Sequence, residues 1–569
     1  LWDVKSGREI RSFSGHGDSV NSVNFSPDGR YIASGSLDNT IRLWDVVSGM
    51  EIRSFTGHSG FVTSITFSPD GRYIASGSAD KTIKLWDVKS GMEIGSFSGH
   101  SGFVTSITFS SDGRYIASGS ADGTIKQWDV EKGILVADFI GFTDGEWIVI
   151  TPQGHYNASP NGDKYLNVRI GNNVYGIDNY REKFFMPDLV KLALSGQSLK
   201  DYKTIADVAL PPSVDIVDTP SEVKGDEVKV TLKLTDQGGG IGYVRLYLND
   251  TSILLDSARG VKITPKAGEK SIYKTYTIRL LEGENTIKAV AFNAEGSMAS
   301  NPAIHRIVSL AKGYKKPSMY AVVIGINEYK NPKLELKYAV ADAKLFAETL
   351  RKIASPLFEK VNINLLTTKD ETSRENIKKT LEGMKALRPD DVFVFYVASH
   401  GTVDEGEYFL ITSNVGSLST RKLKEDALTQ GELKELIANV PTTKKMIIID
   451  TCNAGKLGET IQVAMMTRGM SEETAMKILS SAVGSTIISA STGLQEALEG
   501  YQGHGLFTYA LVEGMKGKAD TDRDGFIRTI ELASYVDGEV PILAEKIFKR
   551  AQYPTTQPIG QSFPVGKVR

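Results

Sequence analysis

The sequence contains very little cysteine: Cys452 is the only one among 569 residues. One cysteine cannot form an internal disulfide, which favours a reducing, cytoplasmic location in which the thiol stays free. An excess of charge is also missing, because 66 lysine and arginine residues face 68 aspartate and glutamate residues. This balance gives no reason to expect nucleic acid or an anionic membrane surface as a partner. No apolar run approaches the roughly 18 residues that a membrane helix requires, so we expect no membrane partner.

The first part of the chain is a repeat with a period of 42 residues. Each copy has Gly-His near its start, Asp-Gly-Arg-Tyr-Ile-Ala-Ser-Gly-Ser in its middle and Trp-Asp at its end. A period of roughly 40–45 residues with these signatures resembles the WD40 repeat, the blade unit of a β-propeller. In that family histidine and aspartate hydrogen-bond within a blade, so we assign the histidines a structural role. The recurring residues are His16, His58 and His100; Asp38, Asp80 and Asp122; and Trp44, Trp86 and Trp128.

Three full repeats occupy residues 1–140, whereas a closed propeller usually has about four to eight blades. Since the chain starts inside a repeat at Leu1, we expect a partial, N-terminally truncated propeller with further blades before it. The resemblance implies a platform for a protein partner, with no chemistry of its own.

Two more regions separate the repeats from the C-terminal part. Residues 141–210 read as a degenerate blade or connector, in which we interpret His155 as structural. Residues 211–310 contain short runs of period two separated by turn residues, which predict an immunoglobulin-like β-sandwich acting as a spacer. The clearest runs are 228–234, 244–248 and 285–292.

From residue 318 to 569 the pattern changes to strands that alternate with helices. This alternation predicts an α/β domain with a mostly parallel sheet and helices on both faces. The spacings of Thr372 with Glu375, and of Thr429 with Glu432, predict capping boxes that open two of the helices. The expected strands are 320–325, 361–366, 391–397, 446–449 and 486–490.

Candidate catalytic residues follow two of these strands. His400 follows the third strand and Cys452 follows the fourth, and the carboxyl ends of parallel strands meet at one edge of a sheet. A nearby imidazole can accept the thiol proton and so create a strong nucleophile. Gly401 and Gly455 allow a substrate to approach backbone N–H groups closely. The alternative is that Cys452 is only a small buried apolar residue.

Four motifs in this region resemble the caspase-like cysteine proteases, on the metacaspase and bacterial side. They are Tyr-Ala-Val-Val-Ile-Gly-Ile-Asn-Glu-Tyr at 320–329, Ala-Asp-Ala at 341–343, Ser-His-Gly at 399–401 and Asp-Thr-Cys-Asn-Ala-Gly at 450–455. The resemblance covers residues 319 to about 564 and implies an endopeptidase that needs no cofactor for its chemistry. Cys452 would be the nucleophile, His400 the general acid and base, and the amides of Gly401 and Cys452 the oxyanion donors.

Substrate preference is suggested by the acids of these motifs. Asp450 lies two residues before Cys452 on a strand end, so both side chains leave on the same side. A buried carboxylate beside the nucleophile favours a cation. The resemblance also implies Asp342 and Glu496 as second and third pocket acids, and cleavage after Arg or Lys, as in metacaspases and paracaspases. Alternatively, Asp450 only caps local backbone and Asp342 lies on a solvated helix face.

Three further features accompany these motifs. His504 is a rival catalytic base, which we rank below His400 because it precedes a helix at a distance from the strands. Residues 455–484 contain basic residues and are a candidate segment for self-cleavage. Residues 520–531 have the spacing of a calcium-binding loop, although Arg528 occupies its ninth position. The expected calcium ligands are Asp520, Asp522, Asp524, Phe526 through its carbonyl, and Glu531.

The sequence therefore predicts a multidomain cysteine endopeptidase with a propeller for partner recognition. A different class remains open: a catalytically inert or zymogen-like adaptor that acts through the propeller.

Overall fold

The computed structural model describes the whole chain except residues 257–269, 313–314, 405–406, 454–471, 491–497, 558–560 and 569, together with the side chains of residues 452, 453, 472, 473 and 557. The chain divides into two compact units, which we describe separately. The first comprises Leu1–Asn167 and Phe184–Asp207, and the second Val168–Lys183 and Val208–Arg569. In the described part, none of the helices combines the length and apolar character needed to cross a membrane.

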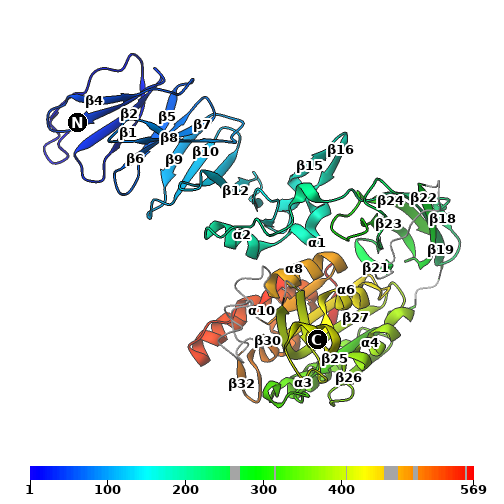
Figure 1. Cartoon of the computed structure of the whole chain (residues 1–569). Coiled ribbons are helices and arrows are strands. Elements are labelled where there is room, and N and C mark those ends of the chain that lie inside the picture. The colour runs from blue at the N-terminus through cyan, green and yellow to red at the C-terminus, as the bar shows by residue number, and fades with distance from the viewer. Residues whose placement is uncertain are drawn as a thin grey trace. The chain divides into compact units, whose positions relative to one another are not determined.

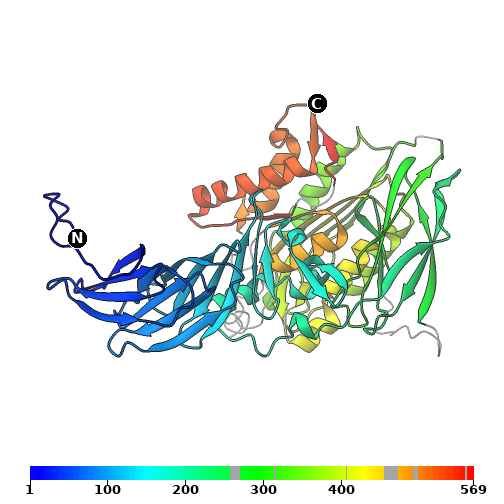
Figure 2. The same cartoon turned by 90° about the horizontal axis from the view of Figure 1, so that it is seen from above.

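The repeats of the first unit form antiparallel sheets that stack one after another, drawn as successive blue sheets in Figures 1 and 2. We call these sheets the first, second and third blade. The first contains β1 (Val20–Phe25), β2 (Tyr31–Ser36), β3 (Ile41–Asp45) and β4 (Glu51–Phe55); the second β5 (Val62–Phe67), β6 (Tyr73–Ser78), β7 (Thr82–Asp87) and β8 (Glu93–Ser98); the third begins with β9 (Val104–Phe109), β10 (Tyr115–Ser120) and β11 (Thr124–Asp129).

Each blade contains the same hydrogen-bonded network. In the first blade His16 Nδ1 lies 2.8 Å from Asp38 Oδ2, and His16 Nε2 lies 2.7 Å from Ser34 Oγ. The Trp44 indole N–H donates to the same hydroxyl at 2.8 Å. These bonds satisfy the polar groups that the blade buries, which confirms the structural role of the histidines. The corresponding sets are His58, Asp80, Ser76 and Trp86, and His100, Asp122, Ser118 and Trp128.

The first blade leaves an apolar face open on its β1 side. Val20, Val23 and Phe25 are 50%, 66% and 51% exposed. The residues one period later are covered by the preceding blade and are at most 6% exposed: Val62, Ile65 and Phe67. The same sequence positions are therefore exposed or buried according to whether a blade packs against them.

The connector continues the third blade, whose sheet gains β12 (Ile134–Gly141), β13 (Trp147–Ile150) and β14 (Tyr156–Ala158). His155 is buried there and its ring stacks on Phe184 at 5.2 Å between centroids. Helix α2 (Pro187–Leu194) packs against this sheet.

The second unit begins with β15 (Asn167–Ile170), β16 (Asn173–Gly176) and the short helix α1 (Arg181–Phe184). Two sheets follow and enclose one hydrophobic core, so a sandwich is present, as the period-two runs predicted. Its immunoglobulin-like class stays a prediction. One sheet has the order β17 (Ser213–Val217), β19 (Glu227–Thr235), β22 (Ser271–Arg279); the other β18 (Glu222–Val223), β24 (Ala303–Ser309), β23 (Gly283–Ala291), β20 (Val244–Leu248), β21 (Thr251–Asp256).

The sandwich is not a detached spacer, because its edge strand β21 is bonded to the domain that follows. The Thr251 hydroxyl donates to the Thr443 carbonyl at 3.1 Å, and the Leu255 amide donates to the side chain of Asn439 at 2.8 Å. Lys445, which is 2% exposed, donates to the carbonyls of Ser252 at 2.6 Å and Ile437 at 2.9 Å. The interpretation of the sandwich as a spacer is therefore corrected. These hydrogen bonds connect the sandwich to the strand that leads to Cys452.

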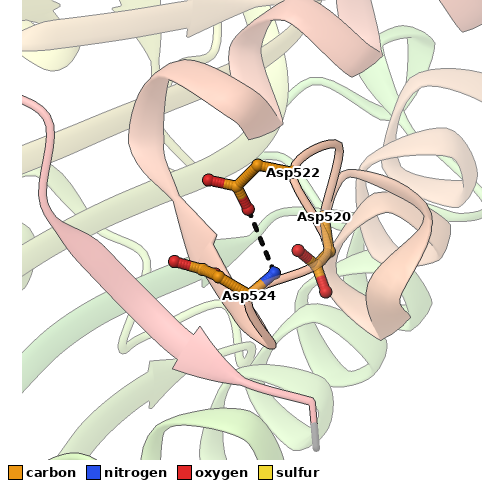
Figure 3. Close-up of side chains that lie close together, drawn as sticks. All are labelled: Asp520, Asp522 and Asp524. Atoms are coloured by element: carbon orange, nitrogen blue, oxygen red, sulfur yellow. Dashed lines mark hydrogen bonds between the residues drawn. The ribbon is translucent and has the colours of Figure 1, made fainter.

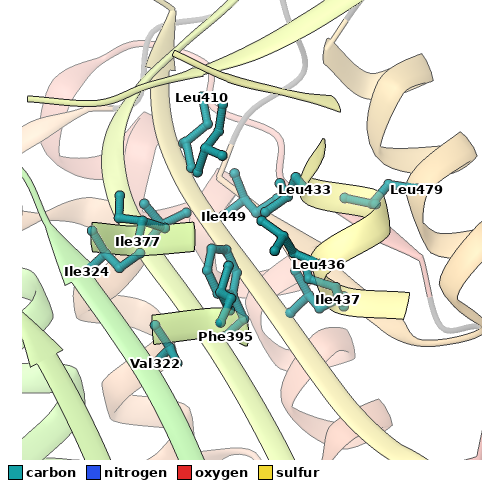
Figure 4. Close-up of a cluster of buried hydrophobic side chains, with 14 of the residues drawn as sticks. Val322, Ile324, Ile377, Phe395, Leu410, Leu433, Leu436, Ile437, Ile449 and Leu479 are labelled. Carbon is teal, nitrogen blue, oxygen red and sulfur yellow. The ribbon is translucent and has the colours of Figure 1, made fainter. Parts of the chain in front are cut away.

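The C-terminal domain is built on one twisted sheet, shown in Figure 1. Its main path has the order β26 (Val361–Leu366), β25 (Met319–Gly325), β27 (Val392–Asp404), β30 (Lys444–Asn453), β31 (Thr486–Ser489) and β35 (Thr555–Gln557), and along this path the strands are parallel except for β35. Residues 446–449 of β30 alternate between two cores. Ile447 and Ile449 face the first core with α4 (Arg374–Glu382), α6 (Gln430–Ala438) and α8 (Glu472–Val483), drawn in Figure 4. Met446 and Ile448 face the second with α3 (Ala339–Ala354), α9 (Leu506–Glu513) and α10 (Thr529–Leu543).

Two local predictions have different outcomes. The Thr429 capping box is confirmed, because its hydroxyl accepts from the Glu432 amide and Glu432 accepts from the Thr429 amide. The Thr372 capping box is wrong: α4 has Ser373 as its N-cap, and the Thr372 hydroxyl donates to the Thr368 carbonyl at 2.9 Å. The Thr372 hydroxyl thus bonds to a nearby turn carbonyl instead of capping the helix.

Candidate active site

His400 and Cys452 are direct register partners on the adjacent parallel strands β27 and β30. Both strands run further than the sequence predicted. β27 continues through His400 to Asp404 because β28 (Glu407–Ile411) pairs with this extension and places Ile411 opposite His400. The expectation that the third strand stops before His400 is therefore corrected, while the juxtaposition of the two residues is retained. The side chain of Cys452 lies outside the described part, as do residues 454–471, which include Gly455.

The His400 imidazole is oriented by the backbone of another segment. Its Nε2 lies 2.9 Å from the Leu334 carbonyl, and its ring centroid lies 5.5 Å from that of Tyr329. Because a carbonyl only accepts, Nε2 carries the proton and Nδ1 is the basic nitrogen of the neutral ring. The tautomer suits a base whose Nδ1 receives a proton.

Gly401 is required by close packing rather than by an unusual backbone angle. A Cβ at this position would lie 2.8 Å from the Tyr408 ring and 3.2 Å from the Thr451 hydroxyl. Gly401 pairs with Leu410 of β28 on one side and with Asn453 of β30 on the other. Alanine would therefore displace strands on both sides of β27.

An acidic pocket opens beside these strand ends. It is lined by Leu336, Ala339, Asp342, Ala398, Ser399, Asp450, Leu498, Glu499 and Gly505. Asp342 and Asp450 are only 3% and 8% exposed, so the alternative that Asp342 lies on a solvated helix face is wrong. A Cβ at Gly505 would lie 3.0 Å from Asp342 Oδ2 and 3.7 Å from Asp450 Oδ2. The space next to Gly505 is therefore shared by the two carboxylates that the sequence predicted.

Burial of these acids disfavours their charged forms. Burial and then the neighbouring Asp342 carboxylate raise the pKa of Asp450 to about 8, and burial raises the pKa of Asp342 to about 7. Glu499 also contributes repulsion to both shifts. A bound cation would relieve this repulsion, and it is the kind of ligand that converging buried carboxylates favour.

The third acid of the pocket is not the one that the sequence predicted. Glu496 lies outside the described residues, and Glu499 lines the pocket instead, from β32 (Glu499–Tyr501). β32 pairs with β33 (His504–Gly505) in a tight hairpin whose turn residues, Gln502 and Gly503, have φ of 52° and 84°. The glycine at the second turn position is the sequence signal that could have indicated this hairpin.

His504 contacts the pocket acid Asp342 and is not a register partner of Cys452. Its Nδ1 lies 2.9 Å from Asp342 Oδ1, and its pKa is lowered, first by burial and then by Lys516. By contrast, His400 is the histidine that pairs with Cys452 in the strand register. This arrangement favours His400 over His504 as the candidate base.

The acidic loop at 520–524 has three aspartate side chains, drawn in Figure 3, and one carboxylate oxygen of each lies within 4.8 Å of those of the other two. Asp520 Oδ1 is shielded from solvent and has no hydrogen-bond partner among the described residues. However, Arg528 Nη2 lies 2.6 Å from Asp524 Oδ2, and Glu531 accepts from the Arg528 amide at 2.9 Å. The three aspartates fit a hard cation, whereas Glu531 is turned to the start of α10.

The loop also has a partner strand. After it, β34 (Phe526–Arg528) pairs with β36 (Pro564–Lys567) near the C-terminus. This pairing joins residues that are far apart along the chain.

Comparison with known proteins finds family matches in the N-terminal and C-terminal parts of the chain. Residues 318–559 match the caspase domain family, and residues 7–45, 49–87 and 91–129 match the WD domain, G-beta repeat. Over 44 residues the chain is 50% identical to guanine nucleotide-binding protein subunit beta of Zea mays and 54% identical to ribosome assembly protein 4 of Saccharomyces cerevisiae. Each match covers 8% of this chain, and they cover 12% and 8% of the two relatives, so the chain spans only a small part of their length. These matches show that the chain carries a caspase domain, of a cysteine peptidase family, preceded by WD40 repeats.

Proposed function

We propose that the protein is a cysteine endopeptidase that cleaves after Arg or Lys and recognises a protein partner through its WD40 repeats. The observation that carries this proposal is the acidic pocket beside the paired strand ends of His400 and Cys452. A pocket lined by Asp342, Asp450 and Glu499 would repel the side chain of an aspartate and would attract a guanidinium or ammonium group.

In the proposed mechanism the Cys452 thiol gives its proton to Nδ1 of His400, and the thiolate attacks the scissile carbonyl carbon. The carbonyl oxygen takes up the electron pair as an oxyanion, to which the amides of Gly401 and Cys452 donate. Collapse of this intermediate forms a thioester as the C–N bond breaks, and the protonated His400 supplies a proton to the leaving amine. Water, deprotonated by His400, then hydrolyses the thioester and restores the thiol.

The contact between His400 and the Leu334 carbonyl supports this assignment of roles. It holds the proton on Nε2, so the neutral ring has its lone pair on Nδ1. When the ring becomes protonated, the same carbonyl accepts from a cationic donor, which stabilises the imidazolium.

The repeats support an interaction platform rather than a second enzyme. In each blade the serine hydroxyl that the histidine contacts is buried and accepts from a tryptophan indole, so it is not placed to attack a substrate. We propose a protein partner for this surface, a protein substrate for the pocket and a cytoplasmic setting for both. For the loop at Asp520 we propose weak calcium binding, in which the aspartates would hold the ion and Arg528 would have to release Asp524.

The test is hydrolysis of fluorogenic peptides with Arg, Lys or Asp before the scissile bond, using the full chain with and without calcium. We expect release from the Arg and Lys peptides, and none with Cys452→Ala or His400→Ala. A His504→Ala variant should keep the catalytic rate constant and lose affinity for the Arg peptide, because His504 contacts Asp342. A profile dominated by aspartate, or activity that survives Cys452→Ala, would contradict the proposal. Lack of activity with a functional propeller would favour the adaptor.

A further inference from the structure

The two pocket carboxylates are held by donors from one short segment, residues 504–508. The Gly505 amide donates to both oxygens of Asp342 at 3.1 Å, and His504 Nδ1 lies 2.9 Å from Asp342 Oδ1. Three residues later, at the start of α9, the Thr508 hydroxyl donates to Asp450 Oδ2 at 2.6 Å. The segment thus contacts both acids, although His504 and Thr508 do not themselves line the pocket.

The Thr508 hydroxyl belongs to a buried chain of hydrogen bonds. Its oxygen also lies 2.6 Å from the Tyr396 hydroxyl on β27. When Asp450 is ionised it can only accept, so Thr508 must donate to Asp450 and accept from Tyr396. Thr508 and Tyr396 are fully buried, so water cannot replace either bond without a rearrangement of the sheet and α9.

This series of hydrogen bonds uses one carboxylate oxygen of Asp450 and leaves the other for a ligand. Thr508 takes Oδ2, and within the described part of the chain Asp450 Oδ1 receives no hydrogen bond. The groups facing Asp450 are Asp342 from α3, Glu499 from β32, Tyr396 from β27 and Thr508 from α9. Among these, Thr508 favours the ionised form of Asp450, whereas the two acids oppose it.

We propose that Thr508 is a positioning residue for cation recognition: its hydroxyl, backed by Tyr396, orients Asp450 and favours its ionised form, so that the pocket binds an amidinium, guanidinium or ammonium group. The inference deepens the proposed function, because it identifies how the same pocket selects Arg or Lys. A carboxylate deprived of a buried donor is harder to ionise, so loss of the hydroxyl should weaken binding most at low pH.

The experiment measures the binding of benzamidine to the full chain carrying Cys452→Ala, by calorimetry between pH 5 and pH 9, with neutral benzamide as the reference ligand. Thr508→Val removes the hydroxyl at constant shape, and Thr508→Ser restores it. Thr529→Val is the matched control, since Thr529 is equally buried and its hydroxyl has no hydrogen-bond partner among the described residues. Benzamidine affinity should rise with pH as the acids ionise.

We expect Thr508→Val to bind benzamidine about ten-fold more weakly near neutral pH and to shift the midpoint of the pH profile up by about one unit. Thr508→Ser and Thr529→Val should bind as the parent does. Equal affinity and midpoint in Thr508→Val, or a parent that does not prefer benzamidine over benzamide, would overturn the inference. Cleavage of an Arg peptide by the unmodified chain is measured in parallel. No turnover together with the expected binding shifts would refute the peptidase proposal and leave the role of Thr508 supported.

Discussion

Asp450→Asn should make the protein more stable and less active at the same time. Asparagine keeps the shape of the side chain and can still accept from the Thr508 hydroxyl, so the substitution removes mainly the charge. Because burial raises the pKa of Asp450 from 3.8 to about 8, the folded protein retains a proton across this interval that the unfolded chain has released. Stability due to this group therefore falls as the pH rises from about 4 to about 8.

The size of the effect follows from the same interval. At roughly 1.4 kcal/mol per pH unit, the rise in pKa from 3.8 to about 8 corresponds to at most about 6 kcal/mol. The neutral amide in the Asp450→Asn variant avoids this cost, so we expect its melting temperature to exceed that of the wild type by roughly 5 °C or more at pH 8 and to match it near pH 4. Cleavage after Arg should fall by a factor of about 100 or more, because the bound cation loses its buried partner.

Thermal unfolding from pH 4 to pH 9, with kinetics on an Arg peptide at pH 8, measures both effects. Asp537→Asn is the control, since Asp537 is exposed on α10 and should change neither property. Parallel plots of melting temperature against pH for Asp450→Asn and wild type would refute the electrostatic reasoning. Unchanged cleavage of the Arg peptide would refute the role of the pocket.

Three further predictions concern other parts of the chain. Glu182→Gln should destabilise the second unit by about 3–5 kcal/mol in denaturant titrations, because it leaves Arg245 and Lys434 buried without their shared carboxylate. Burial lowers the pKa of His155 to about 4, so wild-type stability should fall between about pH 6.5 and pH 4, whereas His155→Phe should lose this dependence in thermal melts. Calorimetry should detect weak calcium binding that Asp520→Ala abolishes and Arg528→Gln strengthens, because Arg528 competes for Asp524; no heat with any of the three proteins would contradict the site.

The strand pattern predicted most of the sheet because buried strands are short apolar runs that local sequence reveals. The juxtaposition of His400 with Cys452 followed from the rule that parallel strand ends share an edge. The length of β27 did not follow, since its extension depends on pairing with β28, a non-local partner.

The pocket was only partly predictable for the same reason. Asp342 and Asp450 stand in recognisable motifs, but Glu499 and Thr508 approach them only because the chain after β31 folds back across the strand ends. Neither residue has a local pattern that distinguishes it from a surface acid or an ordinary helix threonine. The capping box at Thr372 failed because spacing does not reveal that the Thr368 carbonyl competes for its hydroxyl.

The contacts of Lys445 determine which N-terminal truncations keep the fold of the C-terminal domain intact. A fragment that starts at Ser318 lacks the Ser252 carbonyl that accepts from the buried Lys445 side chain, and it lacks the Leu255 amide that donates to Asn439. Lys445 lies at the start of the strand that leads to Cys452. A start at Val208 would keep β21 but lose Glu182, the carboxylate between Arg245 and Lys434. Fragments that begin at Val168 retain both sets of contacts. Loss of activity in a shorter fragment would therefore report a damaged fold and not the removal of an activator.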